Sequence, residues 1–309
     1  MSENTFFNHE ANINSHFFKE LNRVGSFTLL DNESNFFSLS LLGYASLKKE
    51  SSFNISQRKK YDKVSTSIVE LYQCITALFY HINNVKEIEK EIANVIGRYE
   101  GITICADGGV FRADTTSRFD FEYHAFSFAS VRCIYHVFKV IGNACFNKRL
   151  NGKRSFVKSK KIFDEKFRKL SSPSFEEIRI YEAINNLEKL MGRYSILEKL
   201  YKLVNDDGGV DKKSIRDIIA HDNFLNSGNL LITENEIKLR GNLPLDIERY
   251  DEKAERNVYK LSEIMINQAE HIKNFSVEVI ELLIELDFGR QIAADHLFEN
   301  AKSYLNYHD

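Results

Sequence analysis

The sequence predicts an all-α protein, and three observations carry this prediction. Only two Pro and 14 Gly occur among 309 residues, whereas an all-β sandwich or barrel needs turn residues at short intervals. Hydrophobic residues make up 43% of the chain, which is enough to bury a substantial core and argues against disorder. Several long segments carry apolar residues at steps of three and four, the spacing of one helix face.

The pattern divides the chain into an N-terminal extension, residues 1–62, and a helical domain, residues 63–309. The extension is rich in Phe and contains one short predicted helix at residues 36–48, so we expect it to pack on the domain. The clearest helix of the domain spans residues 64–99. Its apolar stripe consists of Ile68, Leu71, Ile75, Leu78, Ile82, Val85, Ile88 and Ile92.

Two further helices follow. Residues 101–116 contain adjacent glycines and predict a loop with some extended structure. A second helix is predicted at residues 117–146. A third is predicted at residues 175–204, because Ser174 and the first-turn acids Glu176 and Glu177 are typical of a helix start. The apolar face of the second helix is predicted to contain Phe121, Ala125, Phe128, Ala129, Cys133, Val137 and Ile141.

The C-terminal part adds a short helical segment at residues 212–221 and a small hairpin formed by residues 230–233 and 237–239. A fourth long helix is predicted at residues 252–286 and a final helix at residues 290–307. The expected fold is therefore a four-helix bundle with a small β-hairpin after the third helix and extra elements at both ends.

The formal net charge is -2, but the charge is unevenly distributed. Residues 148–169 hold ten bases and two acids, a local charge of +8, so the rest of the chain sums to -10. Interleaved Phe residues make this segment the predicted RNA contact, with cations on phosphates and aromatics on bases. The alternative is a solvated charged loop whose Phe side chains pack on the bundle. The predicted RNA-binding residues are Lys148, Arg149, Lys153, Arg154, Lys158, Lys160 and Lys161.

Several functional classes are not expected. The chain has no run of 18 apolar residues and no signal-peptide pattern, so we expect a cytoplasmic protein without a membrane partner. Phosphate-cradling GxxxxGK and GxGxxG loops, HExxH and GxSxG are also missing. Cys74, Cys105, Cys133 and Cys145 form no CxxC pair, so we expect reduced core cysteines and neither a metal nor a cofactor.

One short motif carries chemistry. Arg216, Asp217 and His221 follow the third predicted helix, and the Arg and His side chains can converge on one pocket if the helix ends near His221. A His near neutral pKa can take a proton from an attacking hydroxyl or give one to a leaving oxygen, while a guanidinium stabilises phosphate charge. In RNA the 2′-hydroxyl is the attacking group, which leaves a 2′,3′-cyclic phosphate and requires no metal.

The pattern of Arg, a polar residue, three residues and His at the end of a third helix resembles the signature of the HEPN superfamily. The segment beginning Phe121-Glu122-Tyr123-His124 also resembles the acidic-aromatic helix start of many of these proteins. The resemblance covers about residues 63–286. It implies a four-helix fold and a homodimer whose two motifs form one composite active site.

The resemblance also implies an activity, a metal-independent endoribonuclease that cleaves tRNA or other single-stranded RNA as a toxin or antiviral defence effector. His221 is the implied general acid or base, Arg216 binds the scissile phosphate, and Asp217 orients one of them. Glu122 is expected to position Arg216 across the bundle or else to be an ordinary solvated acid, and His124 is a further cleft candidate. An antitoxin or regulatory protein is an expected partner. The alternative is a non-catalytic HEPN-like module that binds a nucleotide or a protein.

Overall fold

The computed structural model describes residues 55–98, 109–111, 117–194, 229–232, 237–240 and 258–288. These residues are mostly helical, as predicted. The helices are α3 (Ile55–Arg98), α4 (Ser117–Cys145), α5 (Lys153–Phe167), α6 (Phe175–Arg193) and α9 (Leu261–Phe288). The strands are β1 (Gly109–Phe111), β2 (Asn229–Ile232), β3 (Ile237–Arg240) and β4 (Val258–Tyr259). The helices predicted at residues 36–48, 212–221 and 290–307 lie outside the described residues.

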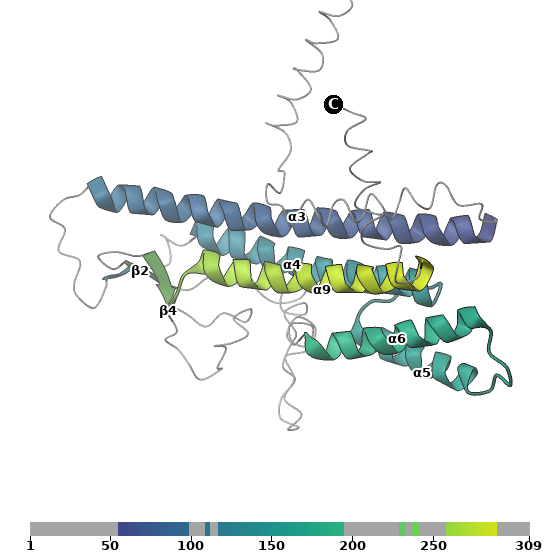
Figure 1. Ribbon diagram of the computed structural model, residues 1–309. Helices are drawn as coiled ribbons and strands as arrows, with labels where there is room; N and C mark the ends of the chain where they lie inside the picture. Colours follow the sequence, from purple (N-terminus) through teal and green to yellow (C-terminus); the bar gives the residue numbers. More distant parts are fainter. Residues whose placement is uncertain are drawn as a thin grey trace, which may run out of the picture.

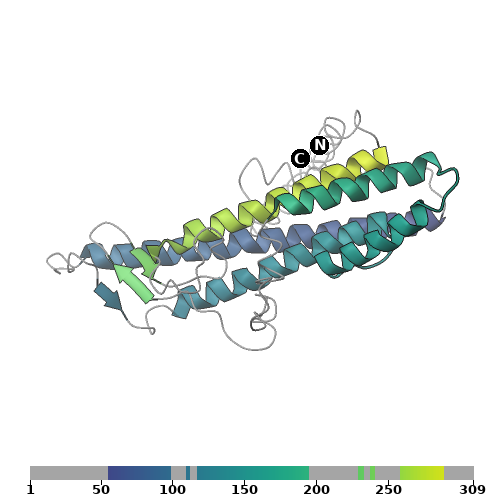
Figure 2. The ribbon, with the colours of Figure 1, turned by 90° about the horizontal axis from the view of Figure 1, so that it is seen from below.

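The three longest helices, α3, α4 and α9, lie side by side, with α3 antiparallel to the other two (Figure 1). The strands lie at one end of this bundle. In the other half, α6 runs along α9 and α5 packs on α6, and both views show the same arrangement (Figures 1 and 2). The connection between α4 and α6 therefore carries a helix of its own.

Helix α3 confirms the predicted apolar stripe. Seven of its eight predicted core residues are buried, and Ile92 is half-buried beside them. The helix begins at Ile55, so its first turns belong to the segment that the sequence assigned to the N-terminal extension. The stripe is buried because α4 and α9 both pack on this helix.

Helix α4 has the predicted bounds to within one residue, but the predicted apolar face was partly wrong. Phe121 and Phe128 are 62% and 49% exposed. The core contacts come from Phe119, Tyr123 and Phe126 instead, all of which are buried. This helix is so rich in aromatic residues that more than one stripe fits the helical spacing, and packing against α3 selects the one around Tyr123.

The chain leaves α4 in a tight turn that directs it back against the same helix. Asn147 has a φ of 48°, and the backbone amides of Phe146 and Lys148 both donate to the Gly142 carbonyl. A Cβ atom at Gly142 would lie 2.3 Å from the Lys148 carbonyl oxygen, so only glycine allows this approach. The loop is therefore fixed directly on the last turns of α4.

Helix α5 was not predicted, because the sequence reading treated residues 148–169 as a charged segment without secondary structure. Its start lacks the usual Ser, Thr, Asp or Asn at the N-cap. Gly152 occupies that position with a φ of 147°, and Ser155 Oγ accepts from the backbone amides of Asn151 and Gly152 at 2.8 and 3.1 Å. A side chain of the first turn thus binds the amides of the two residues that precede the helix.

Helix α6 starts as predicted, with a capping box. Ser174 Oγ accepts from the Glu177 amide at 3.3 Å, and a Glu177 carboxylate oxygen accepts from the Ser174 amide at 2.7 Å. The second of these hydrogen bonds lowers the pKa of Glu177. The predicted residues beyond Tyr194 lie outside the described part of the chain.

The predicted hairpin is present, and it belongs to a larger sheet. The strand order is β1-β2-β3-β4 with antiparallel neighbours throughout. Val258 and Tyr259, which the sequence assigned to the fourth helix, form β4 instead, because they pair with Arg240 and Leu239 of β3. Helix α9 accordingly begins at Leu261, nine residues after the predicted start.

Candidate functional site

The predicted catalytic residues Arg216, Asp217 and His221 lie outside the described residues, as does Cys105. The motif therefore stays a prediction. What the structure describes are the helices on either side of it in the sequence and three places where polar side chains gather: the seam between α3 and α4, the outer face of α5, and a groove between α6 and α9.

Glu122, the predicted positioning acid, lies on the second turn of α4 and faces α3. Its two carboxylate oxygens bind different partners, His81 Nδ1 at 2.7 Å and Asn84 Nδ2 at 3.1 Å. Since a carboxylate only accepts hydrogen bonds, His81 carries a hydrogen on Nδ1 here. The side chains of His81 and Glu122 are 19% and 23% exposed, so Glu122 is a partly buried, fixed acid rather than a freely solvated one.

A surface hollow of about 260 Å³ lies next to Glu122. Arg118 lines it and forms a 2.5 Å ion pair with Glu91, which lowers the pKa of Glu91 and raises that of Arg118. Phe121, exposed on α4, forms another part of its wall. His124, the other predicted cleft residue on this helix, does not line the hollow, because it lies two positions further along α4 and about 200° around its axis from Glu122.

His81 and Asn84 belong to a series of polar contacts, which we call the α3–α4 seam. The pairs follow one another from the C-terminal end of α3 and the N-terminal end of α4. They are Glu91 with Arg118, Asn84 with Glu122, Glu70 with His136 and Ser67 with Asn143. The sequence reading missed His81 and Asn84. A signal was present, since Glu70, Cys74, Ala77, His81 and Asn84 recur at steps of four and three beside the apolar stripe.

The predicted RNA-binding segment forms a two-sided helix in α5. On its inner side Phe156 is fully buried, Phe163 stacks on Phe167, and Phe167 stacks on Tyr181 of α6 with ring centroids 4.2 Å apart. These rings are used in packing, as the alternative expected, but the segment is a helix rather than a loop.

The outer side of α5 carries cations at helical spacing. Arg154, Lys158 and Lys161 are exposed, and within the described part of the chain no ion pair involves them. Lys160 differs, because it lies between Asp164 at 2.6 Å and Glu188 of α6 at 3.4 Å. We call Arg154, Lys158 and Lys161 the α5 cation face.

The other predicted RNA contacts flank this face. Lys148 lies over the Phe146 ring and Arg149 over the Tyr135 ring, at 5.9 and 5.2 Å from the ring centroids, and both side chains are exposed. Lys153, in the first turn of α5, is half-buried and has contacts of its own. Among the predicted RNA contacts, the cations most available to a phosphate backbone are therefore the three of the α5 cation face.

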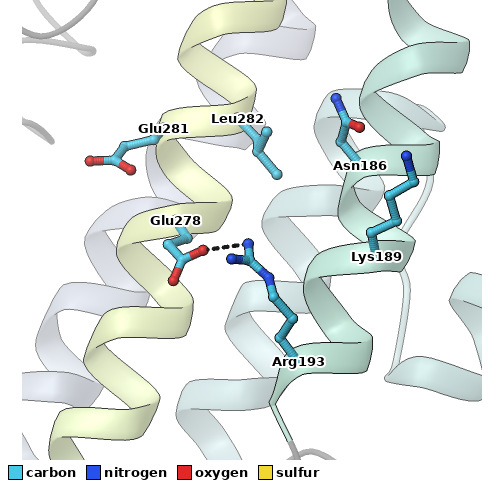
Figure 3. A pocket seen from close by; sticks show the side chains of 6 residues that line it. All are labelled: Asn186, Lys189, Arg193, Glu278, Glu281 and Leu282. Carbon is cyan, nitrogen blue, oxygen red and sulfur yellow. Dashed lines mark hydrogen bonds and ion pairs between the residues drawn. The ribbon is translucent and has the colours of Figure 1, made fainter.

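A groove of about 520 Å³ runs between α6 and α9 (Figure 3). Arg193 reaches across it and donates to a Glu278 carboxylate oxygen at 2.7 Å, and the Tyr194 hydroxyl donates to the other oxygen. Burial, followed by the Glu278 contact, raises the pKa of Tyr194. Since Glu278 neutralises Arg193, the groove presents mixed charge rather than an anion site, with Lys189 and Asn186 along its α6 wall.

Two further observations concern the described residues alone. They contain no group of three or more His, Cys, Asp or Glu side chains arranged to hold a metal ion. Among their helices, none combines the length and the apolar character that a membrane crossing requires.

Comparisons with protein-family models, with curated proteins and with solved structures found no match to this chain.

Proposed function

We propose that this protein is a cytoplasmic, metal-independent endoribonuclease of the HEPN type that acts on tRNA or other single-stranded RNA. In this proposal Arg216 binds the scissile phosphate, His221 moves the proton, and Asp217 orients one of the two. The observation that supports an RNA substrate best is the α5 cation face, three exposed cations on a helix that is anchored through its opposite side.

The α5 cation face suits a phosphate backbone better than a base-specific contact. Its cations lie at positions i, i+4 and i+7 and form a stripe along one side of the helix. The neighbouring aromatic rings are used in packing, so the face offers charge without a stacking platform. We therefore expect salt-sensitive binding with little sequence preference from this helix.

The test is cleavage of a labelled single-stranded RNA and of tRNA by the purified full-length protein in the presence of EDTA. The wild type is expected to give 2′,3′-cyclic phosphate and 5′-hydroxyl ends and to leave DNA intact, because DNA lacks the 2′-hydroxyl. His221→Ala and Arg216→Ala are expected to abolish cleavage. Arg290→Ala and His296→Ala are matched controls that remove the same residue types outside the motif. If the wild type leaves RNA intact, or His221→Ala cuts as well as the wild type, the proposal fails.

Glu122 is a positioning residue for Arg216 in this proposal, and His81 and Asn84 hold its carboxylate in place. Glu122→Gln keeps the size of the side chain and removes its charge. We expect it to lower the maximal cleavage rate while RNA affinity stays unchanged, because the α5 cation face still binds. A change in affinity alone would contradict a positioning role.

We further propose a homodimer with a composite active site and a role as a toxin or antiviral defence effector, restrained by an antitoxin or regulatory protein. A dimer that shares one active site predicts that mixing the His221→Ala and Arg216→Ala proteins restores part of the activity. Expression of the wild type is expected to stop growth, and expression of His221→Ala is expected not to. Toxicity of both proteins without cleavage would favour the non-catalytic binding module instead.

A further inference from the structure

The α3–α4 seam places two thiols opposite each other on facing helices. Cys74 lies one turn of α3 beyond Glu70 and Cys133 lies one turn of α4 before His136, so the antiparallel register that pairs Glu70 with His136 also places Cys74 beside Cys133. His136 Nδ1 lies 3.2 Å from a Glu70 carboxylate oxygen, a distance that suits an ion pair although its angle does not make a hydrogen bond. The same carboxylate also binds Lys139. A thiol, a second thiol, an imidazole and a carboxylate therefore adjoin one another between the two helices.

The two thiols differ in their access to solvent. Cys133 is fully buried, whereas Cys74 is half-buried, and the two are reduced rather than joined. Cys145, also on α4, is buried and forms no disulfide. A small solute can therefore reach Cys74 before Cys133, because Cys133 lies deeper between the helices.

Electrostatics favour the thiolate at Cys74. The neighbouring Cys133 side chain, followed by His136 and the charge of Arg132, lowers the pKa of Cys74 to about 5. Burial raises the pKa of Cys133. The pair therefore holds one reactive thiolate and one protonated thiol.

We propose that Cys74 and Cys133 form a hydroperoxide-sensitive thiol pair, with Cys74 as the attacking sulfur and Cys133 as the resolving one. The Cys74 thiolate attacks one oxygen of hydrogen peroxide, the O–O bond breaks, and the leaving hydroxide takes a proton from solvent to become water. Cys74 is then a sulfenic acid. Cys133 loses its proton, its sulfur attacks Cys74 Sγ, the S–O bond breaks, and the second water leaves. Two thiols and one peroxide thus give one disulfide and two waters.

The disulfide would join α3 to α4 covalently in the middle of their interface. This site does not depend on the ribonuclease proposal, because none of its residues belongs to the predicted catalytic motif or to the α5 cation face. Oxidation can therefore be tested on the full-length protein whether or not it cleaves RNA.

The test is treatment of the full-length protein with hydrogen peroxide, followed by dimedone trapping and peptide mass spectrometry without reductant. We expect a disulfide between the Cys74 and Cys133 peptides in the wild type. Cys133→Ser, whose hydroxyl still donates a hydrogen bond, is expected to stop at a dimedone-trapped sulfenic acid on Cys74, and Cys74→Ser is expected to abolish both products. Cys145→Ser and Cys105→Ser are matched controls that should leave the disulfide unchanged.

The expected size of the effect follows from the thiolate fraction. At pH 6 an ordinary thiol with a pKa of about 8.5 is ~0.3% thiolate and Cys74 is ~90%, a ratio of roughly 300. A thiolate with a lower pKa is intrinsically less nucleophilic, and this lowers the rate of the Cys74 thiolate roughly 30- to 50-fold. The gain in thiolate fraction is larger than this loss. Cys74 should therefore react roughly six- to tenfold faster than the same cysteine in the urea-unfolded chain. Equal rates, a disulfide to Cys105 or Cys145, or no dimedone adduct in Cys133→Ser would each overturn the proposal.

Discussion

Removal of the α5 cation face should change how RNA binding responds to salt. The perturbation is the triple substitution of Arg154, Lys158 and Lys161 by Ala, which leaves the buried side of α5 untouched. Each phosphate contact on a single strand contributes about 0.7 to the slope of log affinity against log salt concentration, so losing three contacts lowers the slope by about 2.1. Between 50 and 200 mM salt, the wild-type affinity should therefore fall about 18-fold more than the affinity of the triple variant.

The assay is fluorescence anisotropy of a labelled single-stranded RNA at four or five salt concentrations, with inactive His221→Ala as the background so that cleavage does not interfere. A matched control replaces Lys86, Lys90 and Arg98, three exposed cations of α3, and changes the net charge by the same amount. If the α5 variant keeps the wild-type slope, or the α3 control lowers it equally, RNA does not bind at the α5 cation face. A general charge effect would then explain any loss of affinity.

Three predictions concern the helices that hold this face. Gly142→Ala should lower the free energy of unfolding by about 1–3 kcal/mol, measured by urea denaturation, because the new methyl group collides with the backbone of the following loop; wild-type stability would show that the loop can move away. A double-mutant cycle of Phe167→Ala and Tyr181→Ala should give a coupling of about 0.5–1.5 kcal/mol, since the rings stack within 6° of parallel, and zero coupling would show that stacking does not anchor α5. Ser174→Ala should cost about 1 kcal/mol. Because the folded-state pKa of Glu177 is lowered, the contribution of Glu177 to the free energy of unfolding should be complete above pH ~5. It should be lost as the pH falls through the lowered pKa. A contribution that does not depend on pH would exclude this linkage.

Periodicity predicted those elements whose cores form one simple stripe. The stripe of α3 is regular over many turns, so its position and its buried face both followed from the sequence. In α4 the bounds were correct, but Phe121 and Phe128 were assigned to the core because an excess of aromatic residues permits several equally periodic faces. Which face is buried depends on neighbouring helices, and this information is not local.

Helix α5 and the polar contacts show two other features that the sequence alone did not predict. The sequence did not indicate α5, because glycine is the N-cap and the segment is dense in Lys and Arg. Ser155 stabilises the start of the helix, and the Tyr181 ring of α6 packs on it. The seam residues His81 and Cys74 lie far in the sequence from Glu122 and Cys133, so their proximity is a property of helix register. Glu122 itself was identified from sequence as a candidate, and the structure adds the two side chains that fix it.

The α3–α4 seam fixes the axial register of two long helices. Its pairs follow one another in opposite chain directions, from Glu91 with Arg118 at one end to Ser67 with Asn143 at the other. A slide of α3 by one helical turn, about 5.4 Å, would separate every one of these pairs at the same time and leave half-buried charges without partners. Relative translation of the two helices is therefore costly. If a bound partner causes a movement in this protein, the hinge should lie outside the α3–α4 pair. The two helices should move together as one rigid unit.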